Sequence, residues 1–146
     1  MATQIPPASK FTGLTRNVIA YSEAFEALVN VAKIRPLVDT DWAQLEALVD
    51  VPRWERLGVF LGAQSETIDW PTYKHYVAQF AQHTNWDGTL RRVTEHGDLV
   101  VLELEERNAR GGEVDVSNTV TIYHFTPAGK LDHLDVYVSP LEKRAG

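Results

Sequence analysis

The residues with acid–base potential in this chain lie on segments where polar and apolar side chains alternate. Alternation of this kind places successive side chains on opposite faces of a β-strand. Leu102, Leu104 and Glu106 therefore share one face of their segment, as do Thr121 and Tyr123 of theirs. A carboxylate beside leucines, as at Glu106, is partly desolvated and suited to proton transfer near neutral pH. Tyr123 could donate a hydrogen bond to a developing oxyanion, with Thr121 orienting the substrate.

The opposite faces of these segments carry a second set of candidates. His133 and Asp135 alternate with Leu134, so they lie on the other side of the last segment. On an inner face they would form a His–Asp acid–base pair. On an outer face they would pair with Arg107 or His124, or with a second subunit. The register decides between these readings, because a slip of one residue exchanges the two faces.

Aromatic residues are numerous for a chain of this length and are candidates for a ligand cavity. The candidates are the four tryptophans and two tyrosines: Trp42, Trp54, Trp70, Tyr73, Tyr76 and Trp86. They could line a pocket for a flat hydrophobic ligand, or they could pack helices against a sheet. For Trp42 and Tyr73 we favour core packing, whereas Trp54, Tyr76 and Trp86 are predicted to contact a substrate.

Composition excludes several kinds of site. The 146 residues include no cysteine, which excludes disulfides, thiolate nucleophiles and cysteine-based zinc sites. The net charge of −6 argues against a nucleic-acid or anionic-membrane partner. None of the five histidines forms a pair at metal-ligand spacing, so we expect neither a metal nor another cofactor. No secretory signal or membrane-spanning stretch is visible, and a cytoplasmic location is the expectation.

The elements that position these residues follow a simple order. Residues 1–15, with two adjacent prolines, are predicted to form an irregular arm, and residues 16–146 a single domain. Apolar spacing and capping signals predict helices at about 16–35, 39–52 and 69–84, and a strand at 53–62. After Trp86 the period changes to two, predicting antiparallel strands at 89–95, 99–107, 114–125 and 131–139. Helices followed by a meander indicate an α+β domain, with about three helices packed on the concave face of a curved antiparallel sheet.

Two stretches carry a resemblance to a known family. "DTDWAQLEAL", after the first helix, and the closing hairpin "YHFTPAGKLDHLDVYVS" resemble the nuclear transport factor 2-like superfamily. This cone-shaped α+β fold is shared by ketosteroid isomerase, limonene epoxide hydrolase, scytalone dehydratase and the polyketide cyclases. The resemblance implies a pocket between the helices and the concave sheet face, and a convex face that often forms a dimer. It is a poor guide to activity, because the fold hosts many chemistries and some pure binders.

The resemblance to the isomerase implies which alternating face is concave. The concave set would be Leu102, Leu104, Glu106, Thr121, Tyr123, Leu134 and Val136. Glu106 would then be the acid–base residue, Tyr123 the oxyanion donor and Thr121 an orienting group. His133 and Asp135 would lie on the outer face.

The established catalytic residues of these relatives are missing from the matching positions. The general base of the isomerase would fall near Arg56 and its oxyanion-hole acid near Thr121. Ala109 and Val136 stand where the epoxide hydrolase has aspartates, and Trp86 lies where the dehydratase has a histidine. The polyketide cyclases use a histidine or aspartate and little else, so they are the hardest to exclude.

These observations predict a small-molecule-binding protein with cofactor-free proton-transfer chemistry. The reaction would be a cyclisation, isomerisation or dehydration of a hydrophobic substrate. The alternative is a non-catalytic ligand-binding or dimerisation module, which the missing acids favour. We also expect a homodimer through the convex sheet face, where Val120 and Ile122 form an apolar strip beside His124.

Overall fold

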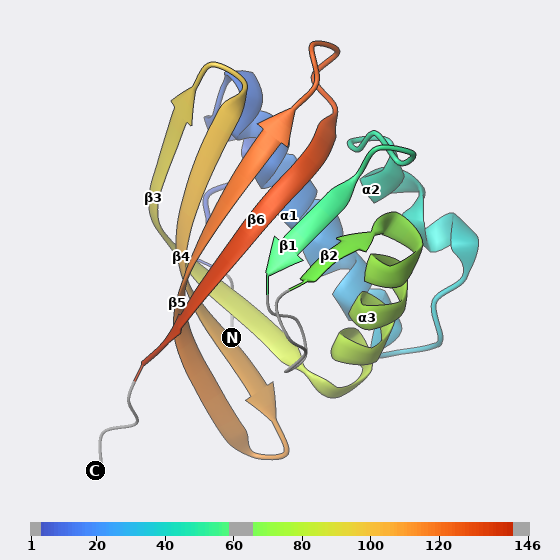
Figure 1. The fold of residues 1–146 in the computed structure, drawn as a ribbon. Helices are drawn as coiled ribbons and strands as arrows, with labels where there is room; N and C mark the ends of the chain where they lie inside the picture. Colours follow the sequence, from blue (N-terminus) through green and yellow to red (C-terminus); the bar gives the residue numbers. More distant parts are fainter. Residues whose placement is uncertain (1–3, 59–65, 142–146) are drawn as a thin grey trace.

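The computed structural model describes residues 4–58 and 66–141 (Figure 1). Four of its five helical elements precede the first strand in the chain, and the fifth lies between the second and third strands. They are η1 (Ala8–Lys10), α1 (Gly13–Ala32), η2 (Asp39–Trp42), α2 (Ala43–Glu46) and α3 (Trp70–His83). The predicted α1 therefore begins inside the segment expected to be an irregular arm. Within the described ranges, none of the helices combines the length and the apolar character that a membrane span requires.

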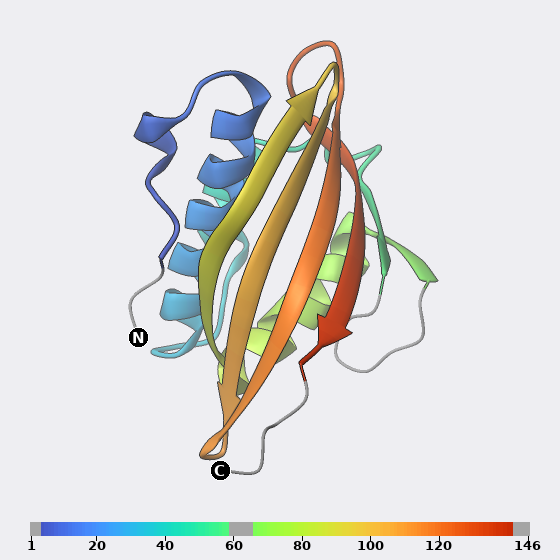
Figure 2. The ribbon, with the colours of Figure 1, turned by 90° about the vertical axis from the view of Figure 1, so that its left-hand side faces the viewer.

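A single curved sheet forms the other layer of the molecule. Its strands are β1 (Glu55–Gly58), β2 (Glu66–Asp69), β3 (Asn85–His96), β4 (Leu99–Arg110), β5 (Glu113–Phe125) and β6 (Leu131–Pro140). Their spatial order is β2-β1-β6-β5-β4-β3. The helices cover one face of the sheet, and Figure 2 shows the four long strands in front of them. This arrangement confirms the predicted α+β fold of helices on the concave face of a sheet.

The sheet differs from the prediction in one pairing. β1 pairs with β6 in parallel, with Arg56 opposite Leu134, so the sheet is mixed rather than wholly antiparallel. β2 was not predicted and pairs with β1 in an antiparallel hairpin. β2 has only four residues, too short for a period-two pattern to be recognised, whereas β1 lies within the predicted strand 53–62. The part of the predicted strand 53–62 that follows Gly58 lies outside the described residues.

The start of α3 follows the predicted capping chemistry. The backbone N–H of Thr72 donates to Oδ1 of Asp69 at 3.0 Å, and Pro71 lies in the first turn. An N-cap carboxylate satisfies a donor that the helix leaves unpaired, and proline is tolerated where no partner is needed. The helix therefore begins where the sequence indicates, and it directs Trp70, Tyr73 and Val77 into the core.

The core lies between the helices and the concave face. Val100, Leu102 and Leu104 of β4 are buried, as are Tyr123 of β5 and Leu134 of β6. The predicted alternation of faces is therefore confirmed in all three strands. Buried side chains of α1 and α3 and two further tryptophans complete the core. They are Val18, Ile19 and Leu28 of α1, Trp70, Tyr73 and Val77 of α3, and Trp42 and Trp54.

Candidate active site

A cavity of about 130 Å³ lies between the two long helices and the concave face of the sheet. The helices contribute Tyr21, Ser22 and Phe25 from α1 and Tyr73 from α3. All strands of the sheet other than β2 also contribute side chains to the cavity. The sheet residues are Arg56, Trp86, Leu104, Glu106, Thr121, Tyr123, Leu134 and Val136.

Strand register explains why the candidate catalytic residues converge. Tyr123 lies opposite Leu134, and Thr121 lies opposite Val136, in the β5–β6 pair. Residues paired across neighbouring strands share a face, so all four side chains point to the same side of the sheet. Glu106 follows Leu104 by two residues in β4 and shares that face.

Glu106 is held in place by an indole. Nε1 of Trp86 donates to Oε1 of Glu106 at 2.5 Å. Gly88 lies directly opposite Glu106 on β3, and a Cβ atom there would come within 3.2 Å of the Trp86 ring. Glycine at this position therefore leaves room for the indole to lie against β3 and reach the carboxylate. The other side of the Trp86 ring meets Phe25 edge to face, with centroids 6.1 Å apart.

Three tyrosines supply hydroxyl groups to the cavity. The hydroxyl of Tyr21 donates to the hydroxyl oxygen of Tyr73 at 3.0 Å. The rings of Tyr21 and Tyr123 meet edge to face, with centroids 6.2 Å apart. Burial raises the pKa of Tyr21, Tyr73 and Tyr123 above the ordinary tyrosine value. All three hydroxyls therefore keep their protons at neutral pH and remain hydrogen-bond donors.

Arg56 is the charged residue of the cavity that was not predicted from the sequence; Tyr21, Ser22 and Phe25 were not predicted there either, and Tyr73 was expected in the core. Arg56 is only 6% exposed, and it donates from Nη1 to the carbonyl of Gly58 at 3.3 Å. Burial lowers the pKa of Arg56, whereas the neighbouring tyrosines and Glu106 raise it. An arginine stays protonated even so, and the cavity therefore contains a buried positive charge. One signal could have found it: Arg56 follows Trp54 by two residues, and a tryptophan predicted to face inward implies that Arg56 does too.

The structure brings most, but not all, of the predicted site residues together. Glu106, Thr121 and Tyr123 line the cavity with the predicted substrate contacts Trp86, Leu104, Leu134 and Val136. Three further predicted contacts lie outside its lining: Trp54, Tyr76 and Leu102. Trp54 packs on Tyr73 with centroids 4.6 Å apart, and Leu102 is buried in the core at 2% exposure. Tyr76 lies on the flank of α3, half-buried against the core, with its ring near His75.

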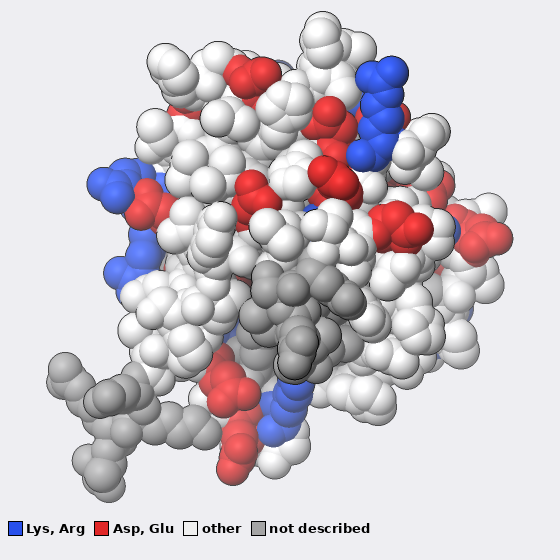
Figure 3. All heavy atoms as spheres, viewed as in Figure 1, with Lys and Arg blue, Asp and Glu red and all other residues white. Residues whose placement is uncertain are grey.

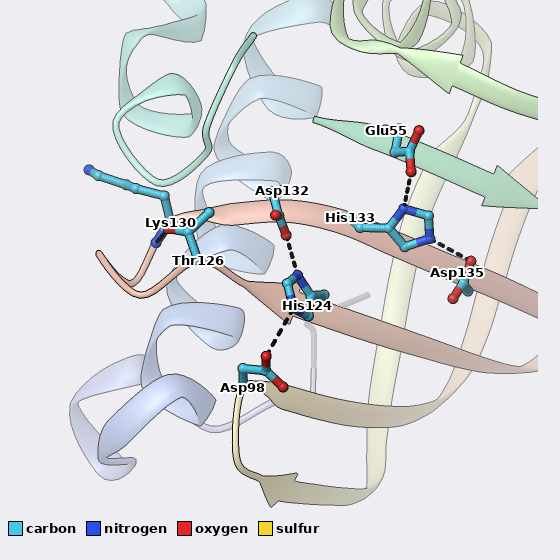
Figure 4. Close-up of polar contacts among 8 residues, drawn as sticks. All are labelled: Glu55, Asp98, His124, Thr126, Lys130, Asp132, His133 and Asp135. Carbon is cyan, nitrogen blue, oxygen red and sulfur yellow. Dashed lines mark hydrogen bonds and ion pairs between the residues drawn. The ribbon is translucent and has the colours of Figure 1, made fainter. Parts of the chain in front are cut away.

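His133 and Asp135 lie on the convex face, as predicted, but with partners that were not predicted (Figure 4). Nδ1 and Nε2 of His133 lie 2.8 Å from carboxylate oxygens of Glu55 and Asp135, respectively. Burial lowers the pKa of His133, but its hydrogen bonds to the two carboxylates outweigh this and raise it. The predicted pairing with Arg107 or His124 is wrong, because both of those side chains have other partners.

Arg107 and His124 each bind two carboxylates of their own. Arg107 pairs with Asp87 at 3.0 Å and with Glu105 at 2.9 Å. His124 lies between Asp132 and Asp98, with nitrogen–oxygen distances of 2.5 and 3.0 Å (Figure 4). The hydrogen bond to Asp132 is the main cause that raises the pKa of His124.

Acidic side chains are prominent on the face seen in Figure 1. Figure 3 shows several of them spread across the upper part of that face, with fewer basic side chains among them. Glu55 of β1 and Asp132 and Asp135 of β6 belong to the same sheet region as His124 and His133. The acid–base residues of the outer face are therefore engaged with one another, on the side of the sheet away from the cavity.

Comparison with known proteins supports the fold and leaves the activity open. No protein-family model matches the chain, and no curated protein matches it in sequence. Among solved structures, a candidate SnoaL-like polyketide cyclase from Shewanella putrefaciens superposes with a TM-score of 0.66 at 11% identity, covering 95% of this chain and 92% of that one. An NTF2-like protein of unknown function from Burkholderia pseudomallei gives 0.65 at 12% identity, covering 87% and 91%.

An epoxide hydrolase of the limonene epoxide hydrolase-like type from Mycobacterium tuberculosis is more distant. It gives a TM-score of 0.54 at 12% identity and covers 82% of this chain and 83% of that one. Likeness at such low identity is evidence about backbone arrangement only. The chain has the nuclear transport factor 2-like fold, a class that includes ligand-binding proteins and enzymes.

Proposed function

We propose that this cavity is the active site of a cofactor-free enzyme that transfers protons on a small hydrophobic substrate. The reaction would be a cyclisation, isomerisation or dehydration. The observation that carries the proposal is the position of Glu106, a carboxylate held by Trp86 in a cavity otherwise lined mainly by aromatic and aliphatic groups. A positioned carboxylate can take a proton from an acidic C–H and return it elsewhere.

The groups around Glu106 suit the charge that such a reaction creates. Removing a proton next to a carbonyl places negative charge on the carbonyl oxygen. Tyr123 would donate a hydrogen bond to that oxygen, and Thr121 would orient the substrate. Arg56 adds a buried positive charge in the same cavity. The aliphatic side chains of Leu104, Leu134 and Val136 would hold the apolar part of the substrate.

Proton exchange tests the proposal without knowledge of the natural substrate. Small ketones are incubated with the protein in deuterated water, and loss of the α-proton signal is followed by NMR. We expect exchange above the buffer rate, and a decrease of about 10²- to 10⁴-fold in Glu106→Gln. Glu103→Gln is the matched control, because Glu103 lies in the same strand on the convex face. Equal exchange rates in wild type and Glu106→Gln would contradict the proposed role.

The non-catalytic alternative has support of its own on the convex face. Val120 lies opposite Tyr137 in the β5–β6 pair, and Tyr137 is 56% exposed. An exposed aromatic beside the predicted apolar strip of Val120 and Ile122 is typical of an interface. We therefore propose a homodimer through this face, and the cytoplasmic location also stays a prediction.

Light scattering tests the dimer. We expect a dimer at micromolar concentration and a monomer for Val120→Glu, because a charge would be buried at the interface. A wild-type monomer at that concentration would contradict the interface. A dimer that shows no proton exchange with any ketone would favour the binding module over the enzyme.

A further inference from the structure

Residues 4–8 form a strap, the N-terminal strap, that joins the edge of the sheet to α1. The backbone N–H of Gln4 donates to the carbonyl oxygen of Gly88 at 2.8 Å, and the N–H of Leu90 donates to the carbonyl oxygen of Gln4 at 3.3 Å. Gln4 thereby pairs in parallel with Thr89 of β3, the last strand in the sheet order. An edge strand leaves such backbone groups open, so one paired residue attaches the strap to the sheet.

The other end of the N-terminal strap is attached to α1. The backbone N–H of Ala8 donates to Oε1 of Glu23 at 2.6 Å. Pro6 and Pro7 lie between the two attachments, and their rings fix the φ angle and remove the N–H that a further ladder hydrogen bond would need. The strap therefore leaves the sheet after Ile5 and continues beside α1 (Figure 2). Ile5 is thus held between two fixed points.

The side chain of Ile5 lies beside the indole that holds Glu106. Gly88 has no side chain, and the point where a Cβ atom would stand is 3.2 Å from the Trp86 ring and 3.5 Å from Cδ1 of Ile5. Glu106 lies directly opposite Gly88 on β4 and accepts the hydrogen bond from Nε1 of Trp86. Ile5, Trp86 and Glu106 therefore come together over the same part of the sheet.

A second, smaller cavity lies behind the indole. Its volume is about 30 Å³, and both Ile5 and Trp86 line it. Trp86 and Ser22 also line the main cavity, so these two side chains separate the two spaces. The smaller cavity has room for about one or two water molecules and is too small for an indole. Ile5 therefore blocks the path by which the Trp86 ring would move away from Glu106.

We infer that Ile5 is a positioning residue for Glu106, because it holds the Trp86 indole in the place from which Nε1 donates to the carboxylate. The inference rests on the proposed function only in taking Glu106 as the acid–base residue. Ile5 is not among the described residues that line the main cavity, so it does not touch a substrate bound there. Its effect reaches the reaction through Trp86. Misplacing a catalytic group by about 1 Å lowers a rate by as much as about 10²-fold.

The indole N–H of Trp86 reports this contact without any ligand. In protein labelled with ¹⁵N the four tryptophans give four indole signals, and the signal that Trp86→Phe removes is that of Trp86. We expect Glu106→Gln to move this signal, because the acceptor of the hydrogen bond loses its charge. Ile5→Ala truncates the side chain at Cβ and enlarges the smaller cavity. It should move the signal in the same direction and speed exchange of the indole N–H with deuterated water by about fivefold or more.

Matched variants separate the strap from core packing in general. Ile5→Leu keeps a branched aliphatic side chain and should retain the wild-type signal. Leu37→Ala also truncates a partly buried side chain that packs against the core, but Leu37 lines neither cavity, so the Trp86 signal should not change. Gln4→Pro removes the N–H that donates to β3 and should speed exchange of the indole N–H, whereas Gln4→Ala keeps that N–H and should not. This last pair decides the question if Ile5→Ala does not fold.

Proton exchange on a ketone tests the consequence for the reaction. Cyclohexanone is incubated with the protein in deuterated water, and the α-proton signal is followed at several ketone concentrations. We expect Ile5→Ala to lower kcat by about tenfold and to change KM by less than about twofold, because Ile5 acts on the carboxylate and not on the bound ketone. Ile5→Leu should keep kcat near that of wild type.

The outcomes separate this inference from the proposed function. A Trp86 signal that is unchanged in both Ile5→Ala and Gln4→Pro, or that Leu37→Ala moves equally, would overturn the inference. Ketone exchange that requires Glu106 but is equal in Ile5→Ala and wild type would also overturn it, and would leave the proposed function in place. A Trp86 signal that depends on Ile5, in a protein that exchanges no ketone protons, would leave the contact through Trp86 in place and remove the enzyme.

Discussion

Replacing Tyr21 by phenylalanine tests whether the hydroxyl groups of the cavity act as a connected chain. Tyr21 and Tyr73 are both buried, and their hydroxyls are 3.0 Å apart. The substitution removes the donor of this hydrogen bond and keeps the ring, including its edge-to-face contact with Tyr123. It therefore changes the hydrogen bonding of Tyr73 with little change in packing.

The expected cost follows from burial. A buried polar group that loses its partner costs about 1–3 kcal/mol. For a domain of this size, 1 kcal/mol corresponds to about 2–4 °C in melting temperature. Tyr21→Phe should therefore lower the free energy of unfolding by about 1–3 kcal/mol. The double variant Tyr21→Phe/Tyr73→Phe removes both partners, so it should cost about 1 kcal/mol less than the sum of the two single variants.

Urea unfolding followed by circular dichroism measures these free energies, with thermal unfolding as a second measurement. Tyr137→Phe is the control, because it keeps the ring that the proposed interface would use and removes only the hydroxyl of a side chain exposed in the single chain, and it should change stability by less than about 0.5 kcal/mol. Single-variant effects that add in the double variant to within about 0.3 kcal/mol would refute the connection between the two hydroxyls.

Three further predictions concern the frame around the cavity. His124 and His133 have pKa values raised in the folded protein above the reference of 6.5, so their stabilising effect is complete below that pH and is lost as pH rises through the folded values. The free energy of unfolding of wild type should therefore exceed that of His124→Gln/His133→Gln by more near pH 6 than near pH 9, and an equal difference would contradict the carboxylate contacts. Gly58 has φ +134°, and a Cβ there would lie 2.4 Å from the carbonyl oxygen of Val136, so Gly58→Ala should cost more than about 1 kcal/mol in urea unfolding. Leu102→Ala should cost about 2–5 kcal/mol in urea unfolding and leave the rate of ketone proton exchange by the folded protein unchanged, whereas a lost exchange rate would place Leu102 in the ligand site.

Alternation along the strands predicted which side chains share a face. Leu104 and Glu106, like Thr121 and Tyr123, lie on the concave side, because side chains of a strand point alternately to its two faces whatever the strand packs against. The cap at Asp69 was equally predictable, because it depends on atoms within a few residues of one another. The outward position of His133 followed from the same alternation together with the family resemblance, but its partner Glu55 did not, because that contact joins two strands far apart in the chain.

The sequence by itself thus determined the class of fold, the start of α3 and which side chains of each long strand share a face, since these depend on local stereochemistry and hydrophobic periodicity. Only the tertiary structure decided that β1 pairs in parallel with β6, which brings Arg56 into the cavity with Glu106. It also decided that the hydroxyls of Tyr21 and Tyr73 meet, and that Trp54 belongs to the aromatic core. Contacts of this kind depend on how distant elements pack, and a pattern with a period of two or 3.6 residues carries no information about that.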